Sequence, residues 1–529
     1  MSWRETTQPY EPTAYFIALA LMAASLTLSP FMMSVSQILL LAIWLFMGDP
    51  ISAKLKRFAH NKVAIVLISL YILHIIGLFY TTDFAYAWKD LRVKLPLLIF
   101  PLILSSTKPL NQRYTGWLLL VYVLSVLVAT SISFSHYLQH DYTDIRKISR
   151  HISHIRICLN IVLVMGIIGY HLFTRKMPWW ESLICVLLMG WFAYQLYIFE
   201  SLSGYAALLG IIAAAVLYLF FNKVKNKGWR IVSFVIILGV PILAAWLLYR
   251  TISPMLHVAP VDLTTLDKKT AQGHDYWHDT LYFPVEDGHY VGLYICQMEM
   301  REAWNQRSSL DYDGLTTNGE NLEATLIRYL ASKGLRKDAE GIAALDDQDI
   351  RNVEQGIANY VNWSRSGLYA RLSETLFEYG QYRRFNNPNG GSLSQRLEYT
   401  RASWHLIKKH PVFGVGTGDI PQAYQQAYNE LQSPLEAQYR HKAHNQYLSI
   451  TVGFGVIGLL LFLFVLLYPY LASKENRTML YTLFMVIILI SMLPEDTIES
   501  QAGVSFYAFF NSLFIFAFKN RKGNTPLTS

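Results

Sequence analysis

The sequence predicts an all-α polytopic membrane protein with about twelve transmembrane helices and a mainly helical domain outside the membrane. Two observations lead to this fold class. Of the 529 residues, 53% are hydrophobic and only 16% are charged, whereas soluble domains carry roughly a quarter charged residues. The chain also contains many apolar runs of about 20 residues, which is the length a helix needs to cross a bilayer.

Twelve apolar runs are interpreted as spanning helices. They are 13–29, 31–48, 63–80, 93–107, 116–136, 155–173, 181–199, 204–221, 231–249, 446–470, 478–493 and 503–518. The fourth run is the least regular, because Pro96 and Pro101 interrupt it. Residues 1–12 are polar and lack the pattern of a cleavable signal, so the first run is expected to remain as an anchor.

The basic residues of the short loops predict the orientation. With the N-terminus inside, the inner loops hold 18 Lys and Arg residues and the short outer loops hold 7, which is the usual positive-inside bias. Both termini are therefore expected in the cytoplasm. The loops also account for the net charge of +8, so it does not indicate a nucleic-acid partner. The predicted domains are nine helices in 1–249, an outer helical domain in 250–445 and three helices in 446–529.

The outer segment has patterns of its own. Residues 322–335 and 349–372 show apolar residues at helical spacing, and Asp346-Asp347 precedes the second run as a predicted N-cap. Gly390-Gly391 is expected to separate these helices from the next one. Cys296 is the lone cysteine of the segment, so no disulfide is expected within it.

Two basic groups on the outer side run against the positive-inside trend. Arg92 and Lys94 stand at the mouth of the fourth run. Arg146, Arg150 and His154 recur every four residues and would share one helical face, with Arg156 next to them. Guanidinium groups form paired hydrogen bonds with phosphate oxygens. The two groups therefore suit a diphosphate or an anionic lipid headgroup, and a solvated interfacial helix is an equal alternative.

A third basic group precedes a glycine-rich stretch. Arg396 and Arg401 lie on a predicted helix that Pro411 ends, and they are candidate anion-binding residues. The stretch from Gly414 to Gly418 is interpreted as a structural turn, because no strand precedes it and no Lys-Ser/Thr follows it as in a phosphate-binding loop.

Two histidines, His441 and His444, lie directly before the tenth run. Histidines three residues apart can bind a metal, but without a third ligand nearby they are weak evidence for a metal site. One of them could instead be a general base, since histidine titrates near neutral pH. An interfacial residue at a helix start is the third alternative, and composition does not decide among the three.

A longer pattern around these residues resembles the O-antigen ligase and O-antigen polymerase superfamily. The pattern is His444-Asn445, nine residues, Gly455, two residues and Gly458. The segment from Arg396 to Gly418 is similar to the same family's approach to this histidine. The block 304–359 resembles an insertion in long-loop members of Bacteroidetes type.

The resemblance implies an O-antigen ligase-like glycosyltransferase of the bacterial inner membrane. It would transfer a glycan from undecaprenyl diphosphate to lipid A-core on the periplasmic face, by an inverting displacement without metal or other cofactor. The residues implied are His444 as catalytic base, the diphosphate-binding residues Arg396, Arg92, Arg150, Arg156 and Arg401, and the supporting residues Asn445, His441, Glu495 and Glu499.

One departure and three alternatives remain. Family members commonly carry Ser-Arg-(Gly/Ser) at the turn before the eighth run, but Leu202 stands in the arginine's place in this chain, so that role is not transferred. An O-antigen polymerase, or a ligase that glycosylates protein, would share the pattern. A polysaccharide transporter or flippase is disfavoured, since transport pathways usually need intramembrane ionisable groups and only His74 lies clearly inside a run. An inactive, receptor-like member is the third alternative.

Overall fold

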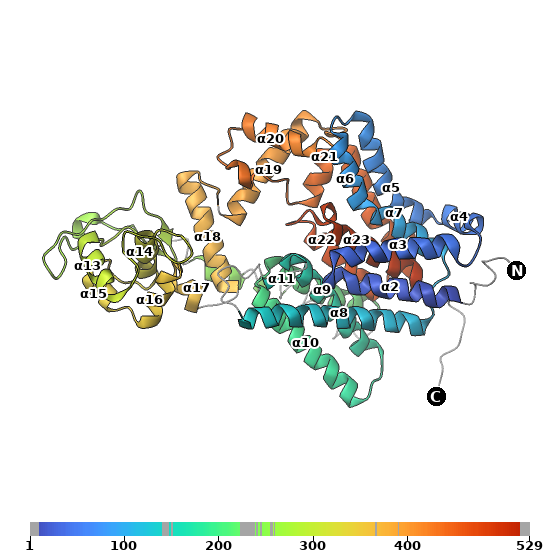
Figure 1. Ribbon diagram of the computed structural model, residues 1–529, viewed down its shortest axis with the longest axis horizontal. Coiled ribbons are helices and arrows are strands. Elements are labelled where there is room, and N and C mark those ends of the chain that lie inside the picture. Colours follow the sequence, from blue (N-terminus) through green and yellow to red (C-terminus); the bar gives the residue numbers. More distant parts are fainter. Residues whose placement is uncertain are drawn as a thin grey trace. The chain divides into compact units, whose positions relative to one another are not determined.

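The computed structural model describes residues 10–139, 148–149, 152–222, 239, 242–243, 246–253, 258, 260–364, 368–389 and 391–518. Within these residues the secondary structure is helical apart from one two-stranded hairpin and isolated bridges (Figure 1). By the contacts between residues, the chain divides into two compact units. The first comprises 1–237, 399–433 and 440–529, and the second comprises 238–398 and 434–439.

The first unit contains the apolar helices. Its elements are α2 (Glu11–Leu28), α3 (Pro30–Phe46), α4 (Ile51–Ala59), α5 (Lys62–Ile76), η2 (Gly77–Tyr80), α6 (Phe84–Lys94), α7 (Pro96–Ser106), α8 (Gln112–Gln139), α9 (His154–Thr174), α10 (Trp179–Phe199), α11 (Leu202–Asn222), α20 (Ile420–Glu430), α21 (Gln446–Ala472), η6 (Lys474–Asn476), α22 (Met479–Ser491), η7 (Thr497–Glu499), α23 (Gln501–Ser512) and η8 (Leu513–Ala517). Helix α19 (Ser392–Lys409) runs across the boundary between the two units.

Seven helices of the described residues are long and apolar enough to cross a membrane, so the chain is a membrane protein of all-α type. An eighth span results only if α3 and α4 are counted together, and the chain bends by 109° between them. The predicted count of twelve is therefore not confirmed. Helices α7, α22 and α23 have 11, 13 and 12 residues, and the predicted run 231–249 lies largely outside the described residues.

Helix α9 forms the centre of this bundle. It packs against α8, α10, α11 and α22, and every residue from Arg156 to Ile168 is buried. A helix that is apolar on all sides is expected to be surrounded by others. Helix α2 lies beside α3 and α8 (Figure 1). The position of α9 matters for the site, because Arg156 lies in its first turn.

The second unit is a small helical domain. Its elements are η4 (Leu263–Thr265), β1 (Val285–Glu286), β2 (His289–Tyr290), α13 (Gln297–Arg307), α14 (Leu322–Ser332), α15 (Ala339–Ala343), α16 (Asp347–Glu354), α17 (Tyr360–Ser364), α18 (Leu368–Phe385) and η5 (Ala437–Tyr439). Its core is apolar and contains the fully buried Trp304 and Tyr329.

Of the two helical runs predicted in this unit, 322–335 forms α14, whereas 349–372 is divided among several helices. Asp346 caps α16 with a complete capping box, in which Asp349 is the reciprocal partner. The predicted run 349–372 is not one helix, because α16 ends at Glu354 and Gly356 follows with φ +83°. Only a glycine adopts this backbone conformation at low cost.

Candidate active site

Helix α21 begins two residues after His444, and its N-cap residue connects this end to the segment that follows α22. The side-chain oxygen of Asn445 accepts a hydrogen bond from the backbone N–H of Leu448 at 3.0 Å, which makes it the N-cap. Its amide nitrogen donates to the carbonyl oxygen of Leu493 at 2.8 Å. The resemblance placed Asn445 as a supporting residue, and this double role fixes the backbone beside His444.

His444 has a left-handed backbone and faces two carboxylates. Its φ is +46°, which is uncommon for a residue other than glycine. Its ring nitrogen Nδ1 lies 3.8 Å from Oδ1 of Asp496 and 4.0 Å from Oε2 of Glu495. The ring of Tyr399 lies 5.4 Å away between centroids. With 35% of its side chain exposed, His444 is partly covered by the protein and partly accessible to solvent.

Gly455, a glycine of the sequence pattern, marks a break in the helix that follows His444. Gly455 has φ +64° and ψ −164° inside α21, so the helix is broken there. The break receives the turn that starts at Pro411, because the N–H of Val456 donates to the Pro411 carbonyl at 2.8 Å. A Cβ at Gly455 would lie 2.1 Å from the carbonyl oxygen of Val412. The spacing from His444 to Gly455 is thus the length of helix between the histidine and this docking point.

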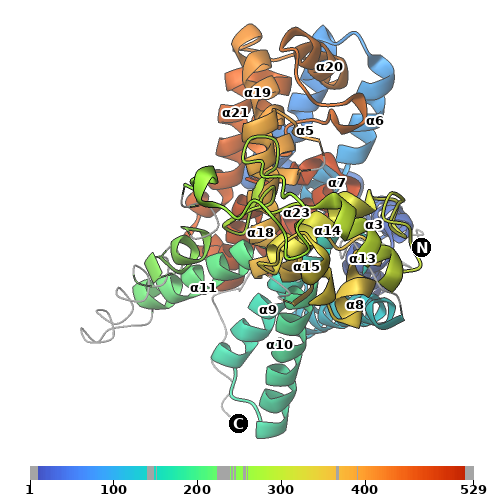
Figure 2. The ribbon, with the colours of Figure 1, turned by 90° about the vertical axis from the view of Figure 1, so that its left-hand side faces the viewer.

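The end of the glycine-rich turn is fastened to the loop between α5 and α6. The carboxylate of Asp419 accepts hydrogen bonds from the N–H groups of Thr82 and Asp83 at 2.9 and 2.8 Å, and from the hydroxyl of Thr81 at 3.2 Å. Burial by itself would raise the pKa of Asp419, but these donors hold it below its ordinary value. Helix α21 accordingly packs against α5, and Figure 2 shows both helices, with α6 and α20, toward the top of the view.

A buried group of charges lies next to residues 440–445, the segment before α21 that is called the His444 loop from here on. The carboxylate of Glu499 is 2.8 Å from Nζ of Lys94 and 3.8 Å from Nζ of Lys442. Lys94 also lies 2.6 Å from Asp90, and the amide of Gln446 donates to Glu499 at 3.1 Å. The two lysines and two carboxylates compensate one another, which a buried set of charges requires.

Glu499 and Lys442 act on each other's ionisation. Burial tends to raise the pKa of Glu499, but Lys94 and Lys442 bring it well below its ordinary value. Burial tends to lower the pKa of Lys442, but Glu499 raises it above its ordinary value. Both groups are therefore charged at neutral pH, and they hold the backbone two residues before His444.

Of the predicted arginines that the structure describes, Arg156 is the one that lies near the two carboxylates of His444. Its guanidinium is buried, and Glu495 and Asp496 are the acidic groups that act on it. Its Nη1 has no hydrogen-bond partner among the described residues. A Cβ at Gly503 would lie 2.9 Å from its Cζ, so the first turn of α23 leaves room for the side chain only because a glycine stands there.

The other predicted arginines are not gathered in the same way. Arg92 is exposed on α6, two residues from the buried Lys94, and Arg401 is exposed on α19. Arg396 is half-buried and belongs to the second unit. Arg150 lies outside the described residues.

The sequence interpretation missed several residues of this site. Asp496 is closer to His444 than Glu495, and Gln446 links Glu499 to α21. Lys94 was noted as an outer basic residue without its carboxylate partners. The signal that could have found it is a lysine flanked by apolar residues, since a buried ammonium group requires a counter-charge.

The carboxylates opposite His444 also form a candidate cation site with it. Ligand atoms of His444, Glu495 and Asp496 lie within 4.8 Å of one another. Carboxylate oxygens with one imidazole could hold a divalent ion, whereas His441, which the sequence offered as the second ligand, is not in this group. A cavity of about 810 Å³ lies away from these residues, between α8, α9 and α10, and is lined among others by Arg113, His171 and Glu181.

Comparison with known families matches residues 357–463 to the family described as O-antigen ligase. This segment is therefore similar to the O-antigen ligase family. It contains Arg396, Arg401, His444, Gly455 and the intervening turn, so the resemblance in the sequence is confirmed at the level of the superfamily. Comparison with curated proteins finds no match.

The family match indicates a coarse functional class. Members of this family are membrane glycosyltransferase-type enzymes, either ligases or polymerases, that act on polysaccharide and lipid-linked substrates. The acidic residues opposite His444 lie beyond residue 463, so the family match covers the histidine and the structure adds its partners.

Proposed function

We propose that this protein is an O-antigen ligase-like glycosyltransferase in which His444 is the catalytic base. The observation that carries the proposal is the placement of His444: it lies two residues before α21 inside the matched segment, with Nδ1 facing Asp496 and Glu495. A histidine whose Nδ1–H faces carboxylates carries its lone pair on Nε2, which is the form that accepts a proton.

The proposed step is a single displacement. Nε2 of His444 takes the proton from a hydroxyl of the acceptor glycan, and the hydroxyl oxygen forms a bond to the anomeric carbon of the donor. The bond from this carbon to the diphosphate breaks, and its electron pair leaves with the lipid diphosphate. The anomeric centre is inverted. Asp496 and Glu495 stabilise the imidazolium, for which the 3.8 Å gap has to close toward a hydrogen-bond distance of about 2.9 Å.

The departing diphosphate needs positive charge rather than a proton, because it is already a weak base. Arg156 is the candidate that stands beside the His444 carboxylates, and the exposed Arg92 and Arg401 are accessible to a ligand. Arg396 and Arg150 remain part of the proposal. Asn445 and Glu499 act by holding the His444 loop, and His441 stands beside the base with its ring 6.0 Å away.

The finer assignments belong to the same proposal. The donor is a glycan on undecaprenyl diphosphate, the acceptor is lipid A-core, and the reaction takes place on the periplasmic face of the inner membrane. Twelve spans, cytoplasmic termini and an outer domain over residues 250–445, between bundles 1–249 and 446–529, complete the topology. The excess of basic residues in the inner loops supports this orientation.

The experiment is the glycan profile of a deletion strain complemented with the wild type, with His444→Ala or with His405→Ala. The last is a matched control, because His405 is a half-buried histidine of the same matched segment that pairs with Glu430. We expect His444→Ala to abolish glycan attachment, with a loss of at least about 10²–10⁴-fold in transfer rate, while the protein stays in the membrane. Attachment retained in His444→Ala contradicts the proposal.

The second candidate within the family is an O-antigen polymerase, since the family domain is shared by both. The same strains separate the two. Loss of a ligase leaves bare cores and accumulated lipid-linked polymer, whereas loss of a polymerase leaves cores that carry a single repeat.

A further inference from the structure

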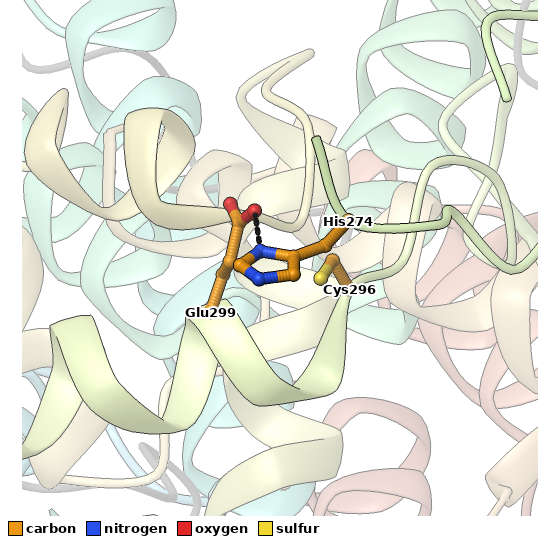
Figure 3. A group of neighbouring side chains, drawn as sticks. All are labelled: His274, Cys296 and Glu299. Carbon is orange, nitrogen blue, oxygen red and sulfur yellow. Dashed lines mark hydrogen bonds and ion pairs between the residues drawn. The ribbon is translucent and has the colours of Figure 1, made fainter. Parts of the chain in front are cut away.

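Three side chains with no part in the proposed reaction meet at the start of α13 in the second unit (Figure 3). They are His274, Cys296 and Glu299, and one ligand atom of each lies within 4.8 Å of the others. Cys296 is the N-cap residue of α13, and Glu299 lies three residues later in its first turn, so both face the same side. Nδ1 of His274 lies 2.8 Å from Oε1 of Glu299.

The backbone around the three residues is built to hold them. The N–H of Thr270 donates to the carbonyl of His274 at 2.8 Å, and the N–H of His274 donates to the Thr270 hydroxyl at 3.1 Å, which closes a turn behind the imidazole. Backbone bridges then join Trp277 to Ile295 and Ile295 to Lys337. Three segments far apart in the sequence are thus fixed side by side at one point.

The carboxylate is positioned by further hydrogen bonds. The Thr270 hydroxyl donates to Oε1 of Glu299, and the N–H of Ala339 donates to Oε2 at 3.2 Å. Such outer partners orient metal-binding carboxylates and histidines in known sites. Cys296 and Glu299 are 5% and 3% exposed, whereas 41% of the His274 side chain is exposed, so an ion can enter from the imidazole side.

The set of donor atoms decides which ion fits. One sulfur, one imidazole nitrogen and one carboxylate oxygen suit Zn²⁺ and similar transition metals, while Mg²⁺ and Ca²⁺ prefer oxygen alone. Bonds of about 2.0–2.3 Å to a tetrahedral ion place its ligands about 3.3–3.7 Å apart, so shifts of about 1 Å suffice. The hydrogen bond between the His274 imidazole and the Glu299 carboxylate lies where the ion would bind.

We propose that His274, Cys296 and Glu299 bind one transition-metal ion of the Zn²⁺ class, with the fourth position open to solvent. On binding, the Cys296 thiol releases its proton to solvent and the imidazole keeps its remaining proton on Nε2, so one proton is released for each ion. The divalent charge is balanced by one thiolate and one carboxylate. The ion links the turn at His274 to α13, a place where Cys296 has no disulfide among the described residues.

The test is a Co²⁺ titration of the full-length protein, purified in detergent and freed of metal with a chelator. We expect one Co²⁺ per chain with a thiolate-to-cobalt charge-transfer band in the near ultraviolet, which Zn²⁺ then displaces. Cys296→Ser is expected to lose the band, and Cys185→Ser, a half-buried cysteine of the first unit, is expected to keep it. Co²⁺ bound without a thiolate band, as at His444 with its carboxylates, contradicts the proposal.

Two further variants keep the thiol and therefore test the site even if Cys296→Ser does not fold. His274→Ala is expected to weaken Co²⁺ binding by more than about a hundredfold, and Thr270→Ala by about ten- to a hundredfold with the band unchanged. His289→Ala, an exposed histidine of the same unit, is the matched control and should bind as the wild type does. Unchanged affinity in both the His274 and Thr270 variants contradicts the proposal.

Discussion

Two acidic groups flank the His444 loop, and the difference between their surroundings separates support from chemistry. Glu499 has only 9% of its side chain exposed and lies within hydrogen-bond distance of Lys94. Asp496 and Glu495 face Nδ1 of His444 at 3.8 and 4.0 Å, which is beyond hydrogen-bond distance. A buried carboxylate with close partners fixes the backbone. Carboxylates near an imidazole but not yet bonded to it can respond when the imidazole gains a proton.

The largest expected effect comes from removing the charge of the buried Glu499. Glu499→Gln removes one charge from a compensated set and leaves Lys442 without its nearby carboxylate. Removing one partner of a buried ion pair typically costs about 3–5 kcal/mol of folding free energy. We expect a clear fall in the midpoint of thermal unfolding in detergent. Glu430→Gln, which removes an exposed partner of Lys409, is the control and should leave the midpoint unchanged; equal midpoints for both variants would contradict the expectation.

The next effect concerns the broken helix under the same loop. Gly455→Ala places a methyl group 2.1 Å from the backbone oxygen of Val412 and forces a non-glycine residue into φ +64°. The backbone conformation and the displaced turn together should cost about 2–3 kcal/mol. Thermal unfolding measures this loss. Gly190→Ala is the matched control, because no atom lies within 4 Å of its added Cβ. An equal loss of stability in Gly190→Ala would contradict the explanation from the backbone of Gly455.

For the carboxylates that face His444, we expect a substitution to reduce activity without reducing stability. Asp496→Asn keeps the size of the side chain but removes the charge 3.8 Å from His444. As a positioning residue, Asp496 should account for about ten- to a hundredfold of the general-base contribution. The measurement is glycan transfer in membranes, with kcat reduced, KM retained and the unfolding midpoint unchanged. A parallel fall in stability would assign Asp496 to the support instead.

The features that the sequence predicted correctly are local in the chain. The helix end before Pro411, the cap at Asp346 and the pattern from His444 to Gly455 each depend on residues within one turn or one helix. The glycine spacing could be recognised, and the structure gives its physical reason in the left-handed backbone of Gly455. Such rules need no knowledge of the packing.

The features that it missed depend on packing between distant segments. Lys94 and Glu499 are 405 residues apart, and no periodicity connects them. Apolar composition likewise shows which residues avoid water but not how far a helix continues. The run 478–493 gives a helix of 13 residues, and the run 31–48 ends at a bend of 109° before α4. Composition therefore predicts membrane location better than it predicts the number of spans.

The smallest expected effect concerns Asp419, which supports the loop from the side of α5 and α6. Asp419→Asn replaces one acceptor of the N–H groups of Thr82 and Asp83 by a donor, and should cost about 1–2 kcal/mol. Because the folded pKa of Asp419 lies below its ordinary value of about 3.9, its stabilisation is present above this value and is lost as the pH falls through the folded pKa. The difference in unfolding midpoint between wild type and Asp419→Asn should therefore stay constant from about pH 7 to pH 5 and shrink only below about pH 4. A difference that already disappears by about pH 6 would mean that another group, and not this carboxylate, holds the turn to the α5–α6 loop.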